Sequence, residues 1–304
     1  MDLLGIGYLG FESPNAKAWR EYGPEVLGLG LAEARKGDAE TVHLRMDDRA
    51  YRIAIHPGER DRVTYIGWEA RHRPAFEDCL ERLRAAGIPF TLGDDELRAR
   101  RRVHAVARFL DPVGYQHEIF YGQQFHPNSF VPGRPHAGFV AEELGVGHIV
   151  LVVPSMPPEL HSFCMDVMGF NWFGYGANGP GWGGFYRAKL NPRSHNIAYG
   201  VVPGRFGVHH IGLEAKKLDD VGIAYDLVQE RNLPLQVTLG RHTQDPVVSF
   251  YSFTPSKFVI EYLTEGAIMP EETFCEVNPQ KLSVWGHKTV GPPLPETVAP
   301  VEGA

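Results

Sequence analysis

Three short apolar stretches of this sequence carry residues that bind metals. VHHIGLEA begins at Val208 and contains His209 and His210, VGHIVLVV contains His148, and KFVIEYLTEG contains Glu261. Side chains alternate between the two faces of a β-strand, so His209 is predicted to face away from His210. If the three strands line one barrel, His148, His210 and Glu261 converge. Two imidazoles and one carboxylate, with coordination positions left open, form the ligand set of non-haem Fe(II) oxygenases.

An internal repeat supports this interpretation. GYLGF (7–11) aligns with GHIVL (147–151), RAYRIA (49–54) with RSHNIA (193–198), RVTYIGWEA (62–70) with GVHHIGLEA (207–215), and DPVGYQHEIF (111–120) with TPSKFVIEYL (254–263). Four matches in order with near-constant spacing indicate two copies of one domain. We predict domains at residues 1–135 and 136–290, followed by a mobile tail at 291–304.

The repeat also predicts a single metal site. The N-terminal copy has Tyr8, Tyr65 and Tyr51 where the C-terminal copy has His148, His210 and His195, and it retains the carboxylate only as Glu118. One carboxylate cannot hold a divalent ion alone. We therefore expect a metal-free first half. Taken alone, His148, His210 or Glu261 would more often be a structural residue than a metal ligand, and only the joint pattern in the repeat favours ligation.

The coarse secondary structure divides each copy into two units of a strand, a helix and further strands. Helices are predicted at 15–27 with Asn15 as N-cap, at 74–86, at 157–168 and at 218–231. Alternating runs such as TVHLRM, YRIAI, HNIAYGVV and VVSFYSF predict strands. The segment 122–145, rich in Gly and Pro, is predicted to link the domains.

Composition limits the class of protein. The 304 residues are 43% hydrophobic and 22% charged, which predicts globular domains, each with its own core. A net charge of −7 argues against a nucleic-acid surface. No run reaches the roughly 20 apolar residues of a membrane span, and the N-terminus lacks leader features. Cys79, Cys164 and Cys275 are scattered, as in a reduced cytoplasmic protein.

Two further clusters could act beside the metal. LGRHTQDPVVSFYSF contains His242, Asp245 and Tyr251, either as a polar loop before a strand or as donors and acceptors for a bound substrate. NPRSHNIA contains His195, either a surface histidine in a turn or, given its Tyr counterpart in the first half, an acid–base residue.

A third motif is a decoy. GYGANG at 174–179 satisfies G-x-G-x-x-G, but Pro180 and GWGG follow it instead of a helix, so no dinucleotide site is predicted. We interpret this segment as a flexible loop that brings Trp172, Phe173, Tyr175 and Trp182 near the pocket. No G-x-S-x-G, phosphate loop or zinc-type Cys/His spacing occurs.

At these residues the chain resembles the type I extradiol catechol dioxygenases of the vicinal oxygen chelate superfamily. The likeness spans nearly the whole chain through WREYGPEVLGL, GHIVL, NPRSHNIA, VHHIGLEA, LGRHTQD, SFYSFTPSKFVIEY and SVWGHKTVG. The resemblance implies an α+β fold of two tandem domains, each a pair of βαβββ modules forming an incomplete barrel. It further implies aerobic ring cleavage of an aryl- or polycyclic-substituted catechol with O2, in a homo-oligomer.

The resemblance also assigns residues. His148, His210 and Glu261 match the Fe(II) ligands, with Mn(II) as the less favoured metal. His195 matches the acid–base histidine. His242 and Tyr251 match residues that hydrogen-bond the oxygen atoms of dioxygen or of the catechol. Asp245 matches an acidic residue that lies next to these groups without binding the metal. We expect the substrate to contact Val150, Trp172, Phe173, Tyr175, Arg187 and Gln244.

Some positions depart from the family pattern. Gln244 stands where Asn is usual, and Arg187 and Lys189 replace more apolar residues on a predicted strand. Because these two cations would share one strand face, we hypothesise that they favour an anionic substrate. Two alternatives remain open on the same fold: a glyoxalase-like metal isomerase and a binding protein without catalysis.

Overall fold

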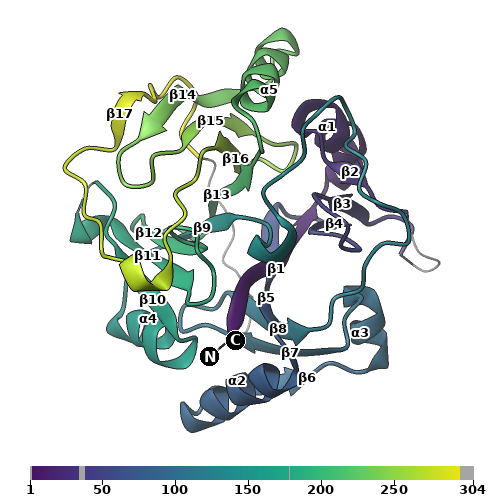
Figure 1. Ribbon diagram of the computed structural model, residues 1–304, viewed down its shortest axis with the longest axis vertical. Coiled ribbons are helices and arrows are strands. Elements are labelled where there is room, and N and C mark those ends of the chain that lie inside the picture. The colour runs from purple at the N-terminus through teal and green to yellow at the C-terminus, as the bar shows by residue number, and fades with distance from the viewer. Residues whose placement is uncertain (1, 34–37, 178, 295–304) are drawn as a thin grey trace.

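The chain forms two open β-sheets that lie side by side (Figure 1). The computed structural model describes residues 2–33, 38–177 and 179–294. Within these residues the first sheet has eight strands in the order β2-β3-β4-β1-β5-β8-β7-β6. The second has nine, in the order β10-β11-β12-β9-β13-β16-β15-β14-β17. Neither order returns to its first strand, so each sheet stays open.

The first half supplies the purple-to-blue elements of Figure 1. Its strands are β1 (Leu3–Ser13), β2 (Gly30–Leu31), β3 (Val42–Arg45), β4 (Ile53–Pro57), β5 (Arg62–Ala70), β6 (Phe90–Leu92), β7 (Ala105–Leu110) and β8 (Gln116–Tyr121). Its helices are a 3-10 turn (Ala16–Ala18), α1 (Trp19–Tyr22), a π-helical turn (Gly23–Leu27), α2 (Arg73–Ala85) and α3 (Asp95–Arg101).

The second half runs from teal to yellow in Figure 1. Its strands are β9 (His148–Val153), β10 (Phe170–Gly174), β11 (Gly183–Ala188), β12 (Ile197–Val201), β13 (Gly207–Glu214), β14 (Leu235–His242), β15 (Val248–Phe253), β16 (Val259–Thr264) and β17 (Ser283–Gly286). Its helical segments are α4 (Pro158–Ser162), α5 (Leu218–Glu230), a π-helical turn (Phe163–Val167) and 3-10 turns at Glu142–Leu144, Pro180–Trp182 and Glu271–Thr273.

The predicted pairs of βαβββ modules are confirmed. In each sheet two modules join through a central antiparallel pair, β1 with β5 and β9 with β13. The outer partners repeat as well: β4 runs parallel to β1 and β12 to β9, while β8 runs parallel to β5 and β16 to β13. Equivalent strand positions in the two halves therefore occupy equivalent places in space.

The first predicted helix is irregular. The segment 16–27 changes from a 3-10 turn to α1 and then to a π-helical turn, and the side chain of Asn15 makes no capping hydrogen bond. Pro24 lacks an N–H and its ring clashes with the preceding turn, which prevents a regular α-helix from continuing. In α2, by contrast, the Nδ1 atom of His72 accepts a hydrogen bond from the Ala75 N–H and caps the helix.

The expectation of a separate core for each half holds only in part: one smaller buried cluster lies within the first half (between Tyr8 and Phe120) and one within the second (between Tyr251 and Val259), but the main core is shared. One buried apolar cluster runs through both sheets and includes residues from Leu3 to Tyr262. Phe11 stacks on Phe258 at 4.5 Å between ring centroids. The Tyr115 hydroxyl donates to the Val152 carbonyl over 2.6 Å. The repeat identifies the modules, but it does not encode that the two copies bury their surfaces against each other.

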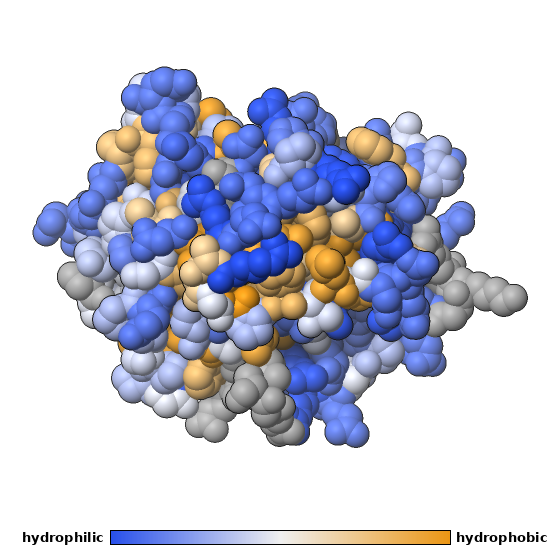
Figure 2. Space-filling view, turned by 90° about the horizontal axis from the view of Figure 1, so that it is seen from below, coloured by the Kyte–Doolittle hydropathy of each residue, from blue (hydrophilic) through white to orange (hydrophobic). Residues whose placement is uncertain are grey.

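The segment between β8 and β9 is largely irregular, and the domain boundary at 135/136, which falls within it, stays a prediction. Of the predicted tail, residues 295–304 lie outside the described residues. Gly291 donates its N–H to the Gln236 carbonyl beside β14. Among the described helices none is long and apolar enough to cross a membrane. The face drawn in Figure 2 is largely hydrophilic, with hydrophobic side chains gathered toward its middle.

Candidate active site

Three neighbouring strands bring the predicted metal ligands together. β13 lies between β9 and β16, and Gly212 on β13 pairs with both His148 and Glu261. His210 lies two residues before Gly212, on the same face. A side chain at 212 would collide with the imidazole, because a Cβ atom there would lie 2.1 Å from Cε1 of His148. Gly212 therefore leaves the space that the His148 ring fills.

The distances fit one metal ion. The Nε2 atom of His148 lies 2.9 Å from Oε2 of Glu261 and 3.2 Å from Nε2 of His210. The third edge, from Nε2 of His210 to Oε2 of Glu261, is 3.4 Å. Two ligands at right angles about 2.1 Å from one ion are about 3 Å apart. Among the described residues this is the single metal-type cluster, and all three members are buried.

The protonation states also suit a metal. Burial alone would raise the pKa of Glu261, but hydrogen bonds from His148 and the other histidines outweigh it and hold that pKa well below its usual range. Burial lowers the pKa of His210, which keeps this ring neutral. A carboxylate and neutral imidazoles are the forms that bind divalent metals.

The prediction that His209 faces away is wrong. The pairing of β13 with β9 shifts between Val208 and His210, so one extra residue forms a bulge. His209 consequently lines the same cavity as His210, and the two Nδ1 atoms lie 2.7 Å apart. The alternation of side chains between the two faces of the strand does not hold at this point, because the extra residue of the bulge places two successive side chains on the same face.

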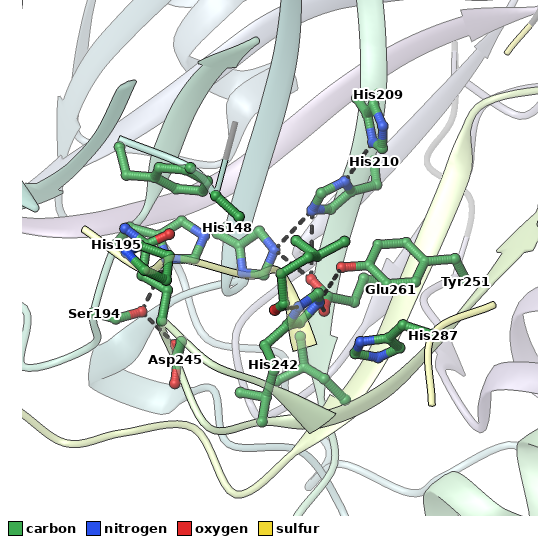
Figure 3. Close-up of a pocket in the computed structure, with 18 of the residues that line it drawn as sticks. His148, Ser194, His195, His209, His210, His242, Asp245, Tyr251, Glu261 and His287 are labelled. Carbon is green, nitrogen blue, oxygen red and sulfur yellow. Dashed lines mark hydrogen bonds and ion pairs between the residues drawn. The ribbon is translucent and has the colours of Figure 1, made fainter. Parts of the chain in front are cut away.

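The other predicted polar residues gather around the ligands (Figure 3). The Nε2 atom of His242 lies 2.7 Å from the Tyr251 hydroxyl and 3.3 Å from Oε1 of Glu261. The ring of His195 lies 4.4 Å from that of His148 between centroids. Asp245 is reached from His195 through the hydroxyl of Ser194.

Several of these groups have shifted pKa values. Burial, reinforced by the neighbouring His148, lowers the pKa of His195 well below its ordinary value. Burial is the strongest influence on His242 and would lower its pKa, but the hydrogen bond to Glu261, the charge of that carboxylate and the hydrogen bond to the Leu282 carbonyl together outweigh it and raise the pKa. Burial and the charge of Glu261 raise the pKa of Tyr251, so this phenol stays protonated as a donor.

The site opens into a cavity of about 300 Å³. Apart from the polar groups at the ligand end, its walls are largely apolar and include Phe173, Trp182, Phe185, Val247, Leu263, Pro279 and Leu282. Gln244 also lines it, but its amide nitrogen donates to the carbonyls of Tyr175 and Val277, at 3.0 and 2.8 Å. Gln244 thus ties together two segments that cover the cavity.

Four of the six residues expected to contact the substrate, Val150, Trp172, Tyr175 and Arg187, are not among the described residues that line the cavity. Val150 is fully buried in β9. The Trp172 ring packs against Tyr175 and Tyr186, outside the described lining of the cavity. Arg187 is also fully buried, forms an ion pair with Glu271, and places its guanidinium 3.7 Å from the centre of the Phe274 ring.

The anionic-substrate hypothesis for Arg187 and Lys189 is therefore not supported by their positions. β11 ends at Ala188, so Lys189 does not continue the strand, and its Nζ lies 3.9 Å from Oε1 of Glu271. Glu271 neutralises the guanidinium away from the cavity. The pattern of a strand could not reveal this partner, which is distant in sequence.

Sequence patterns missed other lining residues. Phe185, Pro279, Leu282 and His287 belong to segments that periodicity does not connect with the metal. Ser194 was also missed, because a serine in a predicted turn is common and its position next to His195 does not by itself predict a functional role. The sequence does give a signal for Gly212. It lies between His210 and Glu214 on a predicted strand, at a position where an apolar side chain would be expected, and a glycine there indicates that another group needs the space.

Fold and metal cluster together define a two-domain metalloprotein with the vicinal oxygen chelate architecture. Residues 6–58 match the family model described as Dihydroxybiphenyl dioxygenase BphC D1. Residues 145–262 match the Glyoxalase/Bleomycin resistance protein/Dioxygenase superfamily.

Comparison with known proteins supports the same architecture over nearly all of the chain. It is 35% identical to an iron-dependent extradiol dioxygenase of Rhodococcus jostii (strain RHA1), covering 94% of this chain and 97% of the other. It is 36% identical to a biphenyl-2,3-diol 1,2-dioxygenase of Paraburkholderia xenovorans (strain LB400), with 95% and 97% covered. The crystal structure of BphC, a halotolerant catechol dioxygenase, superposes with a TM-score of 0.89 at 36% identity, covering 96% and 97%. The chain belongs to the type I extradiol dioxygenase family.

Proposed function

We propose that this protein cleaves the ring of a substituted catechol beside its diol, using O2 and Fe(II) held by His148, His210 and Glu261. The observation that carries the proposal is the buried two-histidine, one-carboxylate cluster at the end of a largely apolar cavity. The donor set fits Fe(II), since it leaves positions free for reactants. When bound, the metal brings the catechol and O2 together and passes electrons between them.

The surrounding residues have distinct tasks. The apolar walls, Phe173 and Phe185 among them, hold an aromatic ring and exclude water. Tyr251 remains protonated and donates a hydrogen bond to a catechol oxygen. His242, beside both Tyr251 and Glu261, orients that phenol.

His195 supplies acid–base chemistry. Its imidazole lines the cavity and is neutral, so it can accept a proton from the catechol and return one later in the reaction. Phe173 and Phe185 pack against its ring.

One experiment separates ring cleavage from the other functions possible on this fold. Anaerobically prepared, iron-loaded protein is mixed with biphenyl-2,3-diol, and ¹⁸O₂ is admitted. We expect a yellow ring-opened product that carries two ¹⁸O atoms. A metal isomerase or a binding protein would consume no O2 and give no yellow product.

Membership of the family also suggests an oligomeric state and a cellular location for this chain. We propose that the chain acts as a homo-oligomer in the cytoplasm, where Cys79 and Cys164 stay as the buried free thiols seen here. Sedimentation of the iron-loaded protein tests the first part, and a single species of monomer mass would refute it.

A further inference from the structure

A continuous hydrogen-bonded chain connects His195 to a carboxylate that does not touch the metal ligands. The Nδ1 atom of His195 lies 2.9 Å from the hydroxyl oxygen of Ser194. The same hydroxyl donates to Oδ2 of Asp245. The other carboxylate oxygen, Oδ1, accepts the N–H of Ala267 over 2.9 Å. Figure 3 shows Ser194 between His195 and Asp245.

The direction of each hydrogen bond follows from proton count. Asp245 accepts hydrogen bonds on both oxygens, as an ionised carboxylate does, so the single proton of the Ser194 hydroxyl is committed to it. The hydroxyl oxygen can then only accept from the imidazole. A neutral His195 must therefore carry its proton on Nδ1, which leaves Nε2 without one.

Packing alone cannot set this arrangement. Phe173 lies nearly parallel to the His195 ring, with 9° between the planes, and Phe185 meets it edge-on at 85°. These contacts fix the plane of the ring. They do not distinguish the ring from the same ring turned over, because nitrogen and carbon positions of an imidazole are nearly equal in size. Only a polar contact at Nδ1 makes the distinction.

The backbone beneath Ser194 is well anchored. The Asn191 side chain accepts the Arg193 N–H at 3.1 Å, and the Asn196 N–H donates to the Tyr186 carbonyl at 2.9 Å. Ser194 itself is 1% exposed. Its hydroxyl therefore occupies a defined place between the two partners.

We propose that Ser194 is a positioning residue: held by Asp245, its hydroxyl accepts the Nδ1 proton of His195 and fixes the ring orientation and tautomer that present a bare Nε2 to the substrate. This inference rests on the proposed role of His195 as the acid–base group. It assigns Ser194 a part in turnover that is exerted through His195.

Asp245→Asn gives the sharpest test. The Ala267 N–H requires the carbonyl oxygen of the new amide to stay in place, so the NH₂ group must face Ser194. The Ser194 hydroxyl would then donate to His195 instead of accepting from it, and the tautomer would be reversed. We expect kcat to fall by about 100-fold or more, as for other histidines held in the wrong tautomer. The KM for the catechol and the iron content should stay near wild type.

Substitutions at Ser194 complete the test. Ser194→Ala should lower kcat about 10-fold, part of the 10²–10⁴-fold range for acid–base groups. Ser194→Thr keeps a hydroxyl and should therefore retain most of the wild-type kcat. In the Ser194→Ala background, Asp245→Asn should cost little more, because the connection is already broken. Ser252→Ala, which removes another buried hydroxyl of the same half, should leave kcat within about two-fold.

The outcomes are separable. Wild-type protein without ring cleavage would refute the proposed function. Active wild type with unchanged kcat in Asp245→Asn and Ser194→Ala would refute the role of Ser194 alone. The role of Ser194 would also be refuted if the fold-decreases in kcat of the two single variants multiplied in the double variant, because the two residues would then act independently.

Discussion

The hydroxyl of Tyr8 donates to Oε2 of Glu118 over 2.6 Å. These residues occupy the places in the first sheet that His148 and Glu261 occupy in the second. Arg101 forms two further hydrogen bonds with the same carboxylate, at 2.8 and 2.9 Å, and lies 3.5 Å from the centre of the Tyr65 ring. In the first half a guanidinium and a phenol thus neutralise and bind the carboxylate that the second half presents to a metal.

This comparison predicts one iron per chain, bound in the second half. His148→Ala, His210→Ala and Glu261→Ala should each lower the iron retained after desalting to below about a tenth of wild type, because two ligands hold a divalent ion weakly. Metal analysis by mass spectrometry gives the ratio. The matched change Glu118→Gln should leave the ratio unchanged, and a halved ratio would place iron in the first half as well.

The buried pair of Arg101 and Glu118 should matter for stability instead. Arg101→Met leaves a fully buried carboxylate without its cation and should reduce the free energy of unfolding by about 3–5 kcal/mol. Adding Glu118→Gln should recover much of that loss, since no charge then remains buried. Urea denaturation measures both. Equal losses in the single and double variants would mean that the ion pair is not the cause.

His195→Ala tests the acid–base assignment. The residue lines the cavity but is not a metal ligand, so iron content should stay at the wild-type level while kcat falls by roughly 10²–10⁴-fold. Anaerobic binding of the catechol, followed by absorbance, should be nearly unchanged. A variant with wild-type turnover would remove His195 from the mechanism.

A histidine at the contact between the halves should make stability depend on pH. Nε2 of His136 lies 2.6 Å from the Tyr262 hydroxyl, which donates to the Leu27 carbonyl, and Nδ1 accepts the Gly138 N–H. Both ring nitrogens are thus used by the neutral form. Burial lowers the pKa of His136 to about 4.

The sign follows from the two states. Unfolded His136 takes up a proton near pH 6.5, whereas the folded chain resists it until about pH 4. The stabilisation is complete above pH 6.5 and is lost progressively as the pH falls toward 4, by at most about 1.4 kcal/mol per pH unit. In His136→Asn the unfolding free energy should fall less steeply over that range. Parallel curves for the two proteins would show that another group is responsible.

Arg187 should not select the charge of the substrate. Its guanidinium is paired with Glu271 and packed on Phe274, outside the cavity lining. Arg187→Met should destabilise the segment around Glu271 but leave the ratio of kcat/KM for neutral and carboxylated catechols within about two-fold. Turnover of the two substrates over a concentration series provides the ratio, and a shift toward neutral catechols would restore the anionic-substrate hypothesis.

Much of this site could be predicted from the sequence because the chain is a duplication. Equivalent positions in two copies showed where His148, His210 and Glu261 replace residues that a core alone would accept. The failures have physical causes. A bulge at His209 breaks strand alternation, and Glu271 reaches Arg187 from a distant segment. The shared core and the place of Ser194 depend on how modules pack, which local patterns do not encode.

Titration of metal-free protein with Fe(II) measures how many iron ions each chain needs for ring cleavage. Aliquots of anaerobic iron are added to a known concentration of chain, and the initial rate of yellow product from biphenyl-2,3-diol in air-saturated buffer is measured at each ratio. We expect the rate to rise linearly and to reach a plateau at one iron per chain, with no rise for His148→Ala. A rate that stays at zero, or that His148→Ala matches, would contradict this expectation.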